Sequence, residues 1–338
     1  MSETPTTDST TFGLKLMSEL RSGSELIEHA VEAERRGLSF LSISDHIHPW
    51  LPEHEHSPFA WSVLGGIAAS TSTIELITGV TCPTFRYHPV IIAQAAATIA
   101  QMSDGRFTLG LGSGERLNEH VTSLEFPAVD LRHDMLREAM ELMSELWSGE
   151  FVTHRGDYFD ADHVKIYEQA GTPVPMVLAV SGDASLDLAA QTGCAGIMAI
   201  EPEAELVDGW IERGGNAGEA WTEVPFAWEP TVEQGLETAR RFRFGMQGWE
   251  VSAELPNPKY FEAATQFLTD EQIGDAIPHG PDPEPYVTAI QEFVDAGFTK
   301  LAIVPVGDDL GGTLDFWEQE VAPRLTGSAS VASTGSAS

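Results

Sequence analysis

Short runs of apolar residues alternate with longer amphipathic stretches along most of the chain. The short runs have the length and the β-branched and aromatic content of buried strands, and the longer stretches carry apolar residues at helical spacing. Ser24–Arg36 and Leu131–Trp147 are two of the helical stretches. The expected strands are Phe12–Leu16, Phe40–Ser44, Ile74–Gly79, Arg106–Leu111, Val174–Val180, Ala195–Ala199, Val224–Trp228 and Lys300–Pro305.

This alternation of strand and helix predicts right-handed βαβ units and a parallel sheet. Eight strands in a chain of 338 residues favour a closed (β/α)8 TIM barrel over an open doubly wound sheet. Helix signals agree with these boundaries. Ser22–Glu25 supplies a hydroxyl cap and an early acid for the first helix, and Gly37 follows that helix as a stop.

The pattern divides the chain into one long barrel region with shorter segments at its ends. We expect a flexible N-terminus at residues 1–10, one barrel domain at 11–325 and a disordered tail of small residues at 326–338. Two segments inside the domain look like insertions. Residues 149–170 predict a hairpin, and the Pro- and aromatic-containing residues 245–285 predict a lid or a dimer contact.

Composition narrows the class of protein and its location. The polar, acidic start of the chain lacks the apolar core of a secretory signal, and no run of about 18 apolar residues predicts a membrane span. Cys82 and Cys194 are the two cysteines, which argues against a disulfide framework and fits a reducing compartment. We therefore expect a cytoplasmic protein.

The charge of the chain is strongly negative. Eighteen basic residues against 52 acidic ones give a net charge of −34, and such a surface repels nucleic acid and anionic lipid. An acidic, disordered interaction protein would share this charge, but the apolar periodicity is too regular for one. We interpret the charge as a halophilic adaptation in which concentrated salt screens the self-repulsion. It indicates the habitat, not the reaction.

Candidate chemistry gathers where the predicted strands end, which is where a TIM barrel carries its reacting groups. Five predicted strands run apolar and then switch to titratable or small residues. One such switch is commonplace, but five together suggest a site. The five strand ends are Ser18–Glu19, Ser44–His46 followed by Trp50, Thr78–Thr81, Gly112–Glu115 followed by Asn118, and Ser181–Asp183.

Each of these residues also has an ordinary structural explanation. Asp45 and His46 could cap the next segment, although a histidine beside a carboxylate can serve as a base near neutral pH. Trp50 could simply pack, or its indole N–H could stabilise an oxyanion in an apolar pocket. Glu115 could be a solvated loop residue or a buried carboxylic acid that donates a proton. Glu19 has the weakest independent case.

Two other stretches suggest ligand sites. Gly110–Gly114 superficially matches a dinucleotide fingerprint, but no suitable acid follows about twenty residues on, so it is better interpreted as backbone that lets a cofactor approach closely. Ser181–Gly182 is either a plain helix cap or a phosphate cradle. The histidine-rich stretch at residues 46–56 has no firm ligand spacing, so no metal is expected.

Three long strings carry a resemblance to a known family. They are SISDHIHPW (Ser42–Trp50), TGVTCPTFRYHPVIIAQAAATIAQM (Thr78–Met102) and GRFTLGLGSGERLNEH (Gly105–His120). Together they resemble the F420-dependent glucose-6-phosphate dehydrogenase group of the luciferase-like oxidoreductases, in a haloarchaeal type of member. Weaker likeness covers Phe12–Leu325. The resemblance implies a homodimeric enzyme that transfers hydride from a small sugar or alcohol to coenzyme F420.

The resemblance also implies roles for residues on the rim. His46 would take the proton from a substrate hydroxyl, Trp50 would stabilise charge near the substrate oxygen, and Glu115 would supply a proton to the reduced cofactor. Glu19 matches a family acid near the same pocket. Gly79–Val80 would form a non-proline cis peptide beneath the cofactor ring. The other implied cofactor contacts are Asp45, Thr81, Gly114, Asn118, Ser181 and Gly182.

One departure from the family pattern concerns the substrate. In the sugar-phosphate enzymes cationic side chains hold the substrate phosphate, whereas Glu203, Ala263 and Ala276 occupy those places here. Lost charge-assisted contacts would weaken phosphate recognition, unless Lys259 and Arg241 compensate. We therefore favour an unphosphorylated aldose or a secondary alcohol over glucose 6-phosphate.

Two other functions stay open at this point. An FMN-dependent monooxygenase would share the fold and the barrel-mouth site. A non-catalytic binding protein is disfavoured, because Asp45, His46, Trp50 and Glu115 occur together. Thermal stabilisation by F420 or by FMN would discriminate between the two enzymes.

Overall fold

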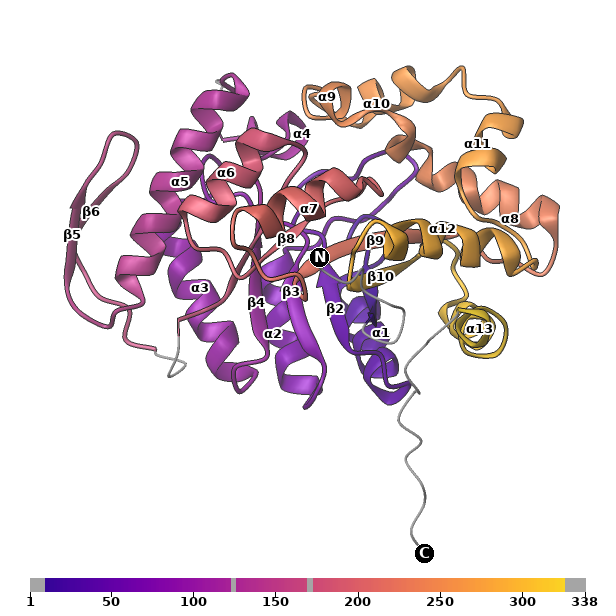
Figure 1. Cartoon of the computed structure of the whole chain (residues 1–338), viewed down its shortest axis with the longest axis horizontal. Helices are drawn as coiled ribbons and strands as arrows, with labels where there is room; N and C mark the ends of the chain where they lie inside the picture. The colour runs from indigo at the N-terminus through magenta and orange to yellow at the C-terminus, as the bar shows by residue number, and fades with distance from the viewer. Residues whose placement is uncertain (1–9, 123–125, 169–172, 326–338) are drawn as a thin grey trace, which may run out of the picture.

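Eight parallel strands close into a barrel in the computed structural model, with helices around the outside (Figure 1). The structure describes residues 10–122, 126–168 and 173–325, so the expectations for residues 1–9 and for the tail 326–338 lie outside it. Around the barrel the strand order is β1-β10-β9-β8-β7-β4-β3-β2, and β2 pairs with β1 to close it. The strands are β1 Thr11–Leu16, β2 Phe40–Ile43, β3 Glu75–Thr78, β4 Phe107–Leu111, β7 Met176–Ala179, β8 Gly196–Met198, β9 Ala220–Phe226 and β10 Lys300–Pro305.

A helix follows each barrel strand, which confirms the predicted (β/α)8 fold. The first helix has the predicted cap: the Ser22 side chain accepts from the Glu25 amide, and the Glu25 carboxylate accepts from Ser22 N–H. The helices are α1 Gly23–Arg35, α2 Ala60–Ser70, α3 Pro89–Met102, α4 Arg116–Glu119 with α5 Val129–Leu146, α6 Asp183–Gln191, α7 Ala204–Glu212, α8 Val232–Ala239, α12 Glu284–Asp295 and α13 Leu310–Phe316, continued by short turns at Trp317–Val321 and Ala322–Arg324.

Two apolar layers hold the barrel together. The larger layer lies between the strands and the surrounding helices, where Leu and Ile side chains of the strands meet the apolar helix faces. A smaller cluster fills the barrel interior, and its residues include Phe40, Val177 and Trp221. Such burial of aromatic and aliphatic side chains is the main stabilising contribution to a fold of this kind.

The predicted strand at Val224–Trp228 is wrong in its start, because β9 begins four residues earlier at Ala220. The first half of this strand carries polar residues, so it lacks the apolar run that identified the other strands. Glu223 pairs with Lys15 across the barrel at 2.7 Å, and Trp221 is buried with the Lys300 ammonium over its ring at 4.2 Å. Polar strand positions satisfied by ion pairs inside a barrel leave no alternating apolar pattern to detect.

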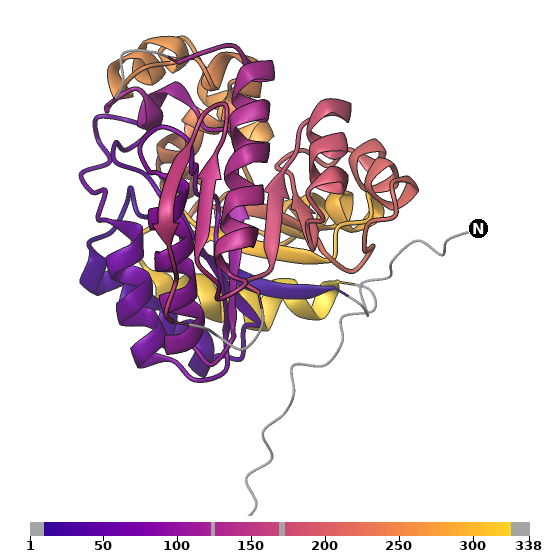
Figure 2. The ribbon, with the colours of Figure 1, turned by 90° about the vertical axis from the view of Figure 1, so that its left-hand side faces the viewer.

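The predicted hairpin is the antiparallel pair β5 Val152–Arg155 and β6 Asp160–Val164. It lies outside α5, away from the barrel, in Figure 1, and it faces the viewer in Figure 2. One carboxylate of α5 holds its turn: Glu138 accepts hydrogen bonds from the amides of Asp157, Tyr158 and Phe159. The hairpin is therefore tied to the scaffold and is remote from the barrel mouth.

The second insertion lies between α8 and α12 and forms short helices at the end of the barrel where α4 also lies (Figure 1). It starts at Arg240, five residues before the predicted 245, because a 3-10 turn continues α8. One backbone bond, from Arg116 N–H to Ala253 C=O at 2.8 Å, joins it to α4. Its elements are the 3-10 turn Arg240–Met246, α9 Trp249–Ser252, α10 Pro258–Thr265 and α11 Asp270–Ala276.

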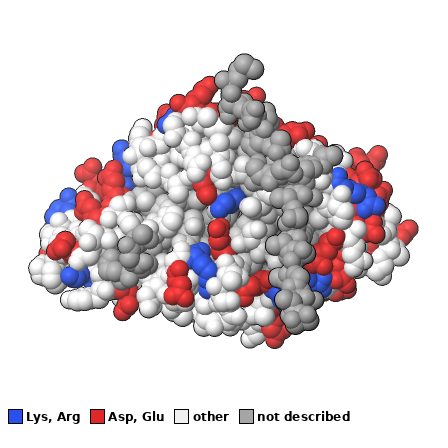
Figure 3. Space-filling view, turned by 60° about the horizontal axis from the view of Figure 1, so that its bottom comes forward, with Lys and Arg blue, Asp and Glu red and all other residues white. Residues whose placement is uncertain are grey.

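Acidic side chains spread over the surface, as the composition predicts. On the face in Figure 3 they crowd the margins, and basic side chains lie beside many of them. In residues 10–122, 126–168 and 173–325, no helix is long and apolar enough to cross a membrane.

Candidate active site

His46 lies at the end of β2, between two carboxylates from neighbouring strand ends. Its Nδ1 is 2.8 Å from Glu19 Oε1, and its Nε2 is 3.5 Å from Glu115 Oε1. Glu19 follows β1 and is 0 % exposed, His46 is 8 % exposed, and Glu115 follows β4 and is partly exposed. The barrel thus brings three separate sequence segments into one row, with Glu19 at its buried end.

The charges of this row stabilise one another. Burial opposes ionisation of Glu19, but the adjacent imidazolium of His46 outweighs it and lowers the pKa of Glu19 to about 2. Burial likewise opposes protonation of His46, but the Glu19 and Glu115 charges outweigh it and raise the pKa of His46 above its usual 6.5. The contact with Glu19 is an ion pair rather than an aligned hydrogen bond. His46 therefore binds its proton more strongly than a free imidazole does, because the ionised Glu19 lies beside it.

Trp50 lies against the His46 ring and forms part of an apolar wall. The two rings meet edge to face with centroids 4.8 Å apart. On its other sides Trp50 stacks on Phe244 at 4.9 Å and meets the edge of Phe261 at 5.1 Å. Trp50 therefore packs against other aromatic rings and also lies beside His46, and its predicted role towards a substrate oxygen stays a prediction. The other members of this wall are Met17, Leu20, Leu51, Leu117, Phe242, Leu255 and Val304.

Asp45, the residue before the base, is fully engaged by the protein itself. Its carboxylate accepts hydrogen bonds from the Thr81 hydroxyl at 2.7 Å and the Tyr87 hydroxyl at 2.9 Å, and the Arg86 guanidinium lies 3.2 Å away. Asp45 is 2 % exposed and Thr81 is 0 % exposed. Asp45 and Thr81, both predicted to contact the cofactor, are therefore buried beneath the surface of the site. There they fix the backbone that follows β2 and β3.

Asn118 connects Glu115 to the loop that follows His46. Its amide oxygen accepts from the N–H groups of Ile47 and His48 at 2.8 and 3.0 Å, and its amide nitrogen donates to Glu115 Oε1 at 2.5 Å. Asn118 is 0 % exposed. Asn118 holds the Glu115 carboxylate opposite His46, so its contribution to the site is to position Glu115.

The peptide bond between Gly79 and Val80 is cis, as the resemblance implies. Lys15 donates to the Gly79 carbonyl at 2.8 Å and fixes this peptide from the barrel interior. Val80 packs against the interior apolar cluster and still keeps exposed surface. Val80 therefore presents a partly exposed apolar side chain after β3, a surface that suits a flat ring.

The glycines of the β4 end make room for the protein's own atoms. A Cβ on Gly112 would lie 2.7 Å from a Val80 methyl group. Gly114 has φ +84°, and a Cβ there would lie 2.8 Å from Cys82 Sγ. The interpretation of this loop as backbone kept bare for a cofactor is thus incomplete, because neighbouring side chains already fill the space at these positions.

Ser181 and Gly182 precede α6, and both keep exposed surface. The Ser181 amide donates to Ser185 Oγ at 3.0 Å. Gly182 is the cap residue of α6, whose first amides have no acceptor within the helix. Of the predicted cofactor residues, those with exposed surface are Gly79, Val80, Ser181 and Gly182, and those buried behind them are Asp45, Thr81, Gly114 and Asn118.

Arg86 and Glu119 belong to the site although sequence reasoning missed them. The Arg86 guanidinium pairs with Asp45, and its amide donates to Glu119 Oε2 at 3.2 Å. Burial raises the pKa of Glu119 to about 7, and the Glu115 charge adds to this while Arg86 opposes it. A basic residue inside an otherwise apolar string of an acid-rich chain was the signal that could have identified Arg86.

Arg241 and Lys259, the two cations that could compensate for the lost phosphate contacts, differ in their surroundings. Arg241 pairs with Asp308 at 2.8 Å, and Arg21 contacts the same carboxylate at 3.0 Å. Lys259 is exposed on α10. The three residues expected at the phosphate-binding places of the sugar-phosphate enzymes are all exposed: Glu203, Ala263 and Ala276.

The histidine-rich stretch does not assemble a metal site. His48 Nδ1 contacts the Leu117 carbonyl at 3.0 Å, and His54 Nε2 contacts the Arg241 carbonyl at 2.8 Å. Within the described part of the chain, no group of three or more His, Cys, Asp or Glu side chains could hold a metal ion.

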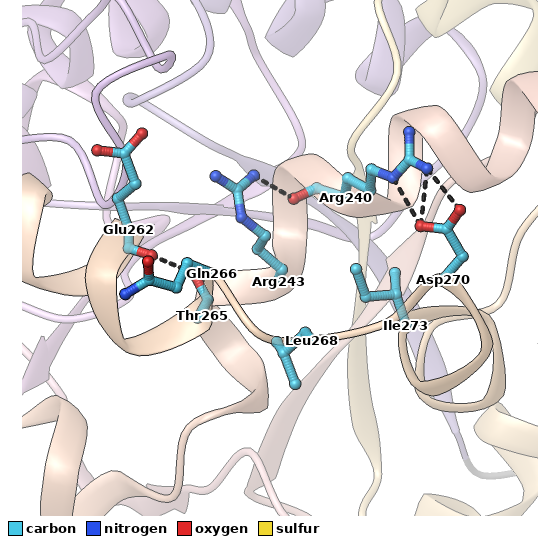
Figure 4. Close-up of a pocket in the computed structure, with 8 residues that line it drawn as sticks. All are labelled: Arg240, Arg243, Glu262, Thr265, Gln266, Leu268, Asp270 and Ile273. Carbon is cyan, nitrogen blue, oxygen red and sulfur yellow. Dashed lines mark hydrogen bonds and ion pairs between the residues drawn. The ribbon is translucent and has the colours of Figure 1, made fainter.

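A pocket of about 280 Å³ lies on the insertion, but none of its lining residues belongs to the row around His46 (Figure 4). Its two arginines are engaged: Arg240 pairs with Asp270, and Arg243 pairs with Glu53. The neighbours of two lining residues, Phe244 beside Arg243 and Phe261 beside Glu262, contact Trp50 instead. This outer pocket is therefore distinct from the row of Glu19, His46 and Glu115.

Known proteins with related sequences and structures match almost the whole chain. The family described as luciferase-like monooxygenase matches residues 6–300. The F420-dependent hydroxymycolic acid dehydrogenase of Mycobacterium tuberculosis is 34% identical, with 95% of this chain and 90% of that protein covered. The F420-dependent glucose-6-phosphate dehydrogenase of Microbacterium testaceum is 33% identical, with coverages of 93% and 97%.

Among solved structures, an F420-dependent secondary alcohol dehydrogenase in complex with an F420-acetone adduct superimposes with a TM-score of 0.84. It is 26% identical in sequence, and the match covers 93% of this chain and 98% of that one.

Proposed function

Because the chain belongs to the luciferase-like monooxygenase family, we propose that it is an F420-dependent dehydrogenase that oxidises an unphosphorylated alcohol or sugar. The observation that carries this proposal is the row of Glu19, His46 and Glu115 at the same end of the barrel as the partly exposed Val80. Bound there, the deazaflavin ring supplies C5 as the acceptor of a hydride from the substrate carbon.

The residues at the mouth fit a flat, anionic cofactor. Val80 offers an exposed apolar surface for the ring, and the cis peptide beneath it is fixed by Lys15. Ser181 and Gly182 lie at the end of β7, two strands from β3 in the barrel, where free helix amides suit a phosphate. Asp45 and Asn118 hold these surfaces in place from behind.

His46 acts as the base in this scheme. As hydride leaves the substrate carbon, the hydroxyl loses its proton to His46, and Glu19 stabilises the imidazolium that forms. The indole of Trp50 lies beside the imidazole ring of His46 and stabilises charge on the substrate oxygen. Glu115, held by Asn118 on the opposite side of His46, would supply a proton to the reduced cofactor from its protonated form, after its carboxylate has taken up a proton.

An unphosphorylated substrate agrees with the charges around the insertion. Arg21, Arg240, Arg241 and Arg243 are each paired with a carboxylate, so none is free to bind a phosphate. The wall around Trp50 is apolar, which suits a secondary alcohol or the hydrophobic face of an aldose. Glucose 6-phosphate is the less favoured substrate.

An FMN-dependent monooxygenase is not favoured, because relatives with 33–34% identity over nearly the whole chain are F420-dependent dehydrogenases. Thermal unfolding in high salt tests the cofactor: we expect F420 to raise the melting temperature and FMN to leave it unchanged. Loss of oxidised F420 absorbance is then followed with secondary alcohols, glucose and glucose 6-phosphate. Stabilisation and turnover with FMN alone would refute the proposal.

The wider setting of the enzyme is also part of the proposal. We propose a cytoplasmic, halophilic homodimer of haloarchaeal type, with one barrel domain over residues 11–325. The excess of acidic over basic residues and the presence of only two cysteines support the salt adaptation and the reducing compartment. Light scattering in high salt would test the dimer.

A further inference from the structure

Arg116 is a basic side chain without a partner in a chain that has a large excess of acids. Within the described ranges, every other basic side chain except Lys259 contacts a carboxylate, a carbonyl or hydroxyl oxygen, or an aromatic ring. Lys259 is exposed on α10, where water solvates its charge. Arg116 is the exception that calls for an explanation.

The surroundings of Arg116 are partly closed. It is partly buried, and its Nε has no accessible surface and no hydrogen-bond acceptor. Its backbone N–H donates to Ala253 C=O, so the residue lies where α4 meets the insertion. A covered, unpaired guanidinium N–H is costly unless a ligand supplies the acceptor. The adjacent carboxylate of Glu115 does not supply it, since that group contacts His46 and Asn118.

Arg116 also lies on the side of the mouth where Ser181 and Gly182 lie. β4 and β7 are paired neighbours, with Leu111 opposite Leu178. Arg116 follows Leu111 by five residues, and Ser181 follows Leu178 by three, so both emerge from adjacent strand ends. The two segments therefore offer a guanidinium and free helix amides at adjacent strand ends, next to the strand that leads to Val80.

We propose that Arg116 binds the anionic tail of the deazaflavin cofactor, through its phosphate or its glutamyl carboxylates. This inference rests on the proposed function. A guanidinium suits both groups, because its paired N–H donors match two oxygens of a phosphate or carboxylate. It also provides local attraction for an anion that the net charge of −34 would otherwise repel.

Calorimetric binding in fixed high salt tests this role without requiring turnover. The ligands are F420 and its ring-and-ribityl fragment, which lacks phosphate and glutamates. Arg116→Ala is expected to weaken F420 binding at least about tenfold, the lower end for a lost charge-assisted hydrogen bond, and to leave fragment binding unchanged. Arg116→Lys keeps the charge and is expected to retain part of the affinity. Arg155→Ala, on the remote hairpin, makes the same change in net charge and should affect neither ligand.

The outcomes separate the alternatives. If Arg116→Ala weakens F420 and the fragment equally, or weakens neither, Arg116 does not bind the tail. Unchanged F420 binding with a raised KM for glucose 6-phosphate would assign Arg116 to the substrate and overturn the proposal. A wild-type protein that binds no F420 refutes the proposed function itself. A cofactor form that has the phosphate but no glutamates shows which group Arg116 binds. If Arg116 binds the phosphate, Arg116→Ala also weakens binding of this form. If Arg116 binds the glutamyl carboxylates, Arg116→Ala leaves binding of this form unchanged.

Discussion

His46 is flanked by two carboxylates that act on it in the same direction. Glu19 and Glu115 both favour the imidazolium, and together they overcome the burial that opposes it. The pair with Glu19 also makes stability depend on pH. The pKa of Glu19 is lowered from 4.5 to about 2, so its stabilising contribution is present above 4.5 and is lost as the pH falls towards 2. That of His46 is present below 6.5 and is lost as the pH rises through its raised pKa.

Glu19→Gln tests this coupling at the level of one residue. The amide keeps the shape but removes a negative charge, so the pKa of His46 falls. Since oxidation of an alcohol requires His46 in its neutral form, the acid limb of kcat/KM against pH is expected to move to lower pH. Glu28→Gln, an exposed change on α1, is the matched control and should leave the profile unchanged. If the acid limb stays at the same pH in Glu19→Gln, Glu19 does not control the pKa of His46.

The barrel strands could be predicted from the sequence because their apolar runs are local signals. The start of β9 could not, because Thr222 and Glu223 are polar and are accommodated only by the closed barrel. The site was predicted where it follows strand ends, as at His46 and Glu115. Arg86 joins it through contacts with Asp45 and Glu119 that are distant in sequence, so no local pattern indicates them.

The insertion shows the same limit at the level of helices. Its helices are short, and α9 has four residues, so intrinsic propensity does not define them. Their positions depend on tertiary contacts, such as the bond from Arg116 to Ala253 and the packing of Phe244 and Phe261 on Trp50. The sequence predicted an insertion here but not which side chains it presents to the base.

Phe244→Ala is expected to destabilise the protein through this packing. Phe244 is 7 % exposed and stacks on Trp50, so its removal is expected to lower the free energy of unfolding by about 3 kcal/mol. Phe267→Ala is the control from the same insertion, because Phe267 is 83 % exposed and its loss should change stability by less than about 0.5 kcal/mol. Denaturant unfolding in fixed salt measures both. Equal effects would show that the insertion does not pack on the site through Phe244.

At the scale of the whole molecule, the acids outnumber the cations far beyond what ion pairs can absorb. Nearly all cations are already paired, so most of the remaining carboxylates have no cation available to pair with. Exposed ion pairs contribute roughly 0–1 kcal/mol each and are weakened by salt. The repulsion among unpaired acids is therefore the larger salt-dependent effect, and it opposes folding.

Raising KCl from 0.1 to 2 M is expected to raise the melting temperature by about 5 °C or more, which corresponds to roughly 3 kcal/mol for a domain of this size. The reason is that the screening length falls from about 10 Å at 0.1 M to about 3 Å at 1 M. A non-ionic osmolyte at matched osmolality is the control and should reproduce little of the effect. A melting temperature that falls or stays level with KCl would contradict the halophilic interpretation.

Transfer of deuterium from a labelled substrate to F420 tests the central step directly. The protein is incubated in ordinary water and high salt with F420 and a secondary alcohol, or glucose, that carries deuterium on the carbinol carbon. Mass spectrometry of the reduced cofactor is expected to show one added deuterium, and His46→Ala should slow its appearance at least about tenfold. Reduced F420 that carries no deuterium, or no reduction by any alcohol or sugar despite tight F420 binding, would contradict hydride transfer from the substrate carbon.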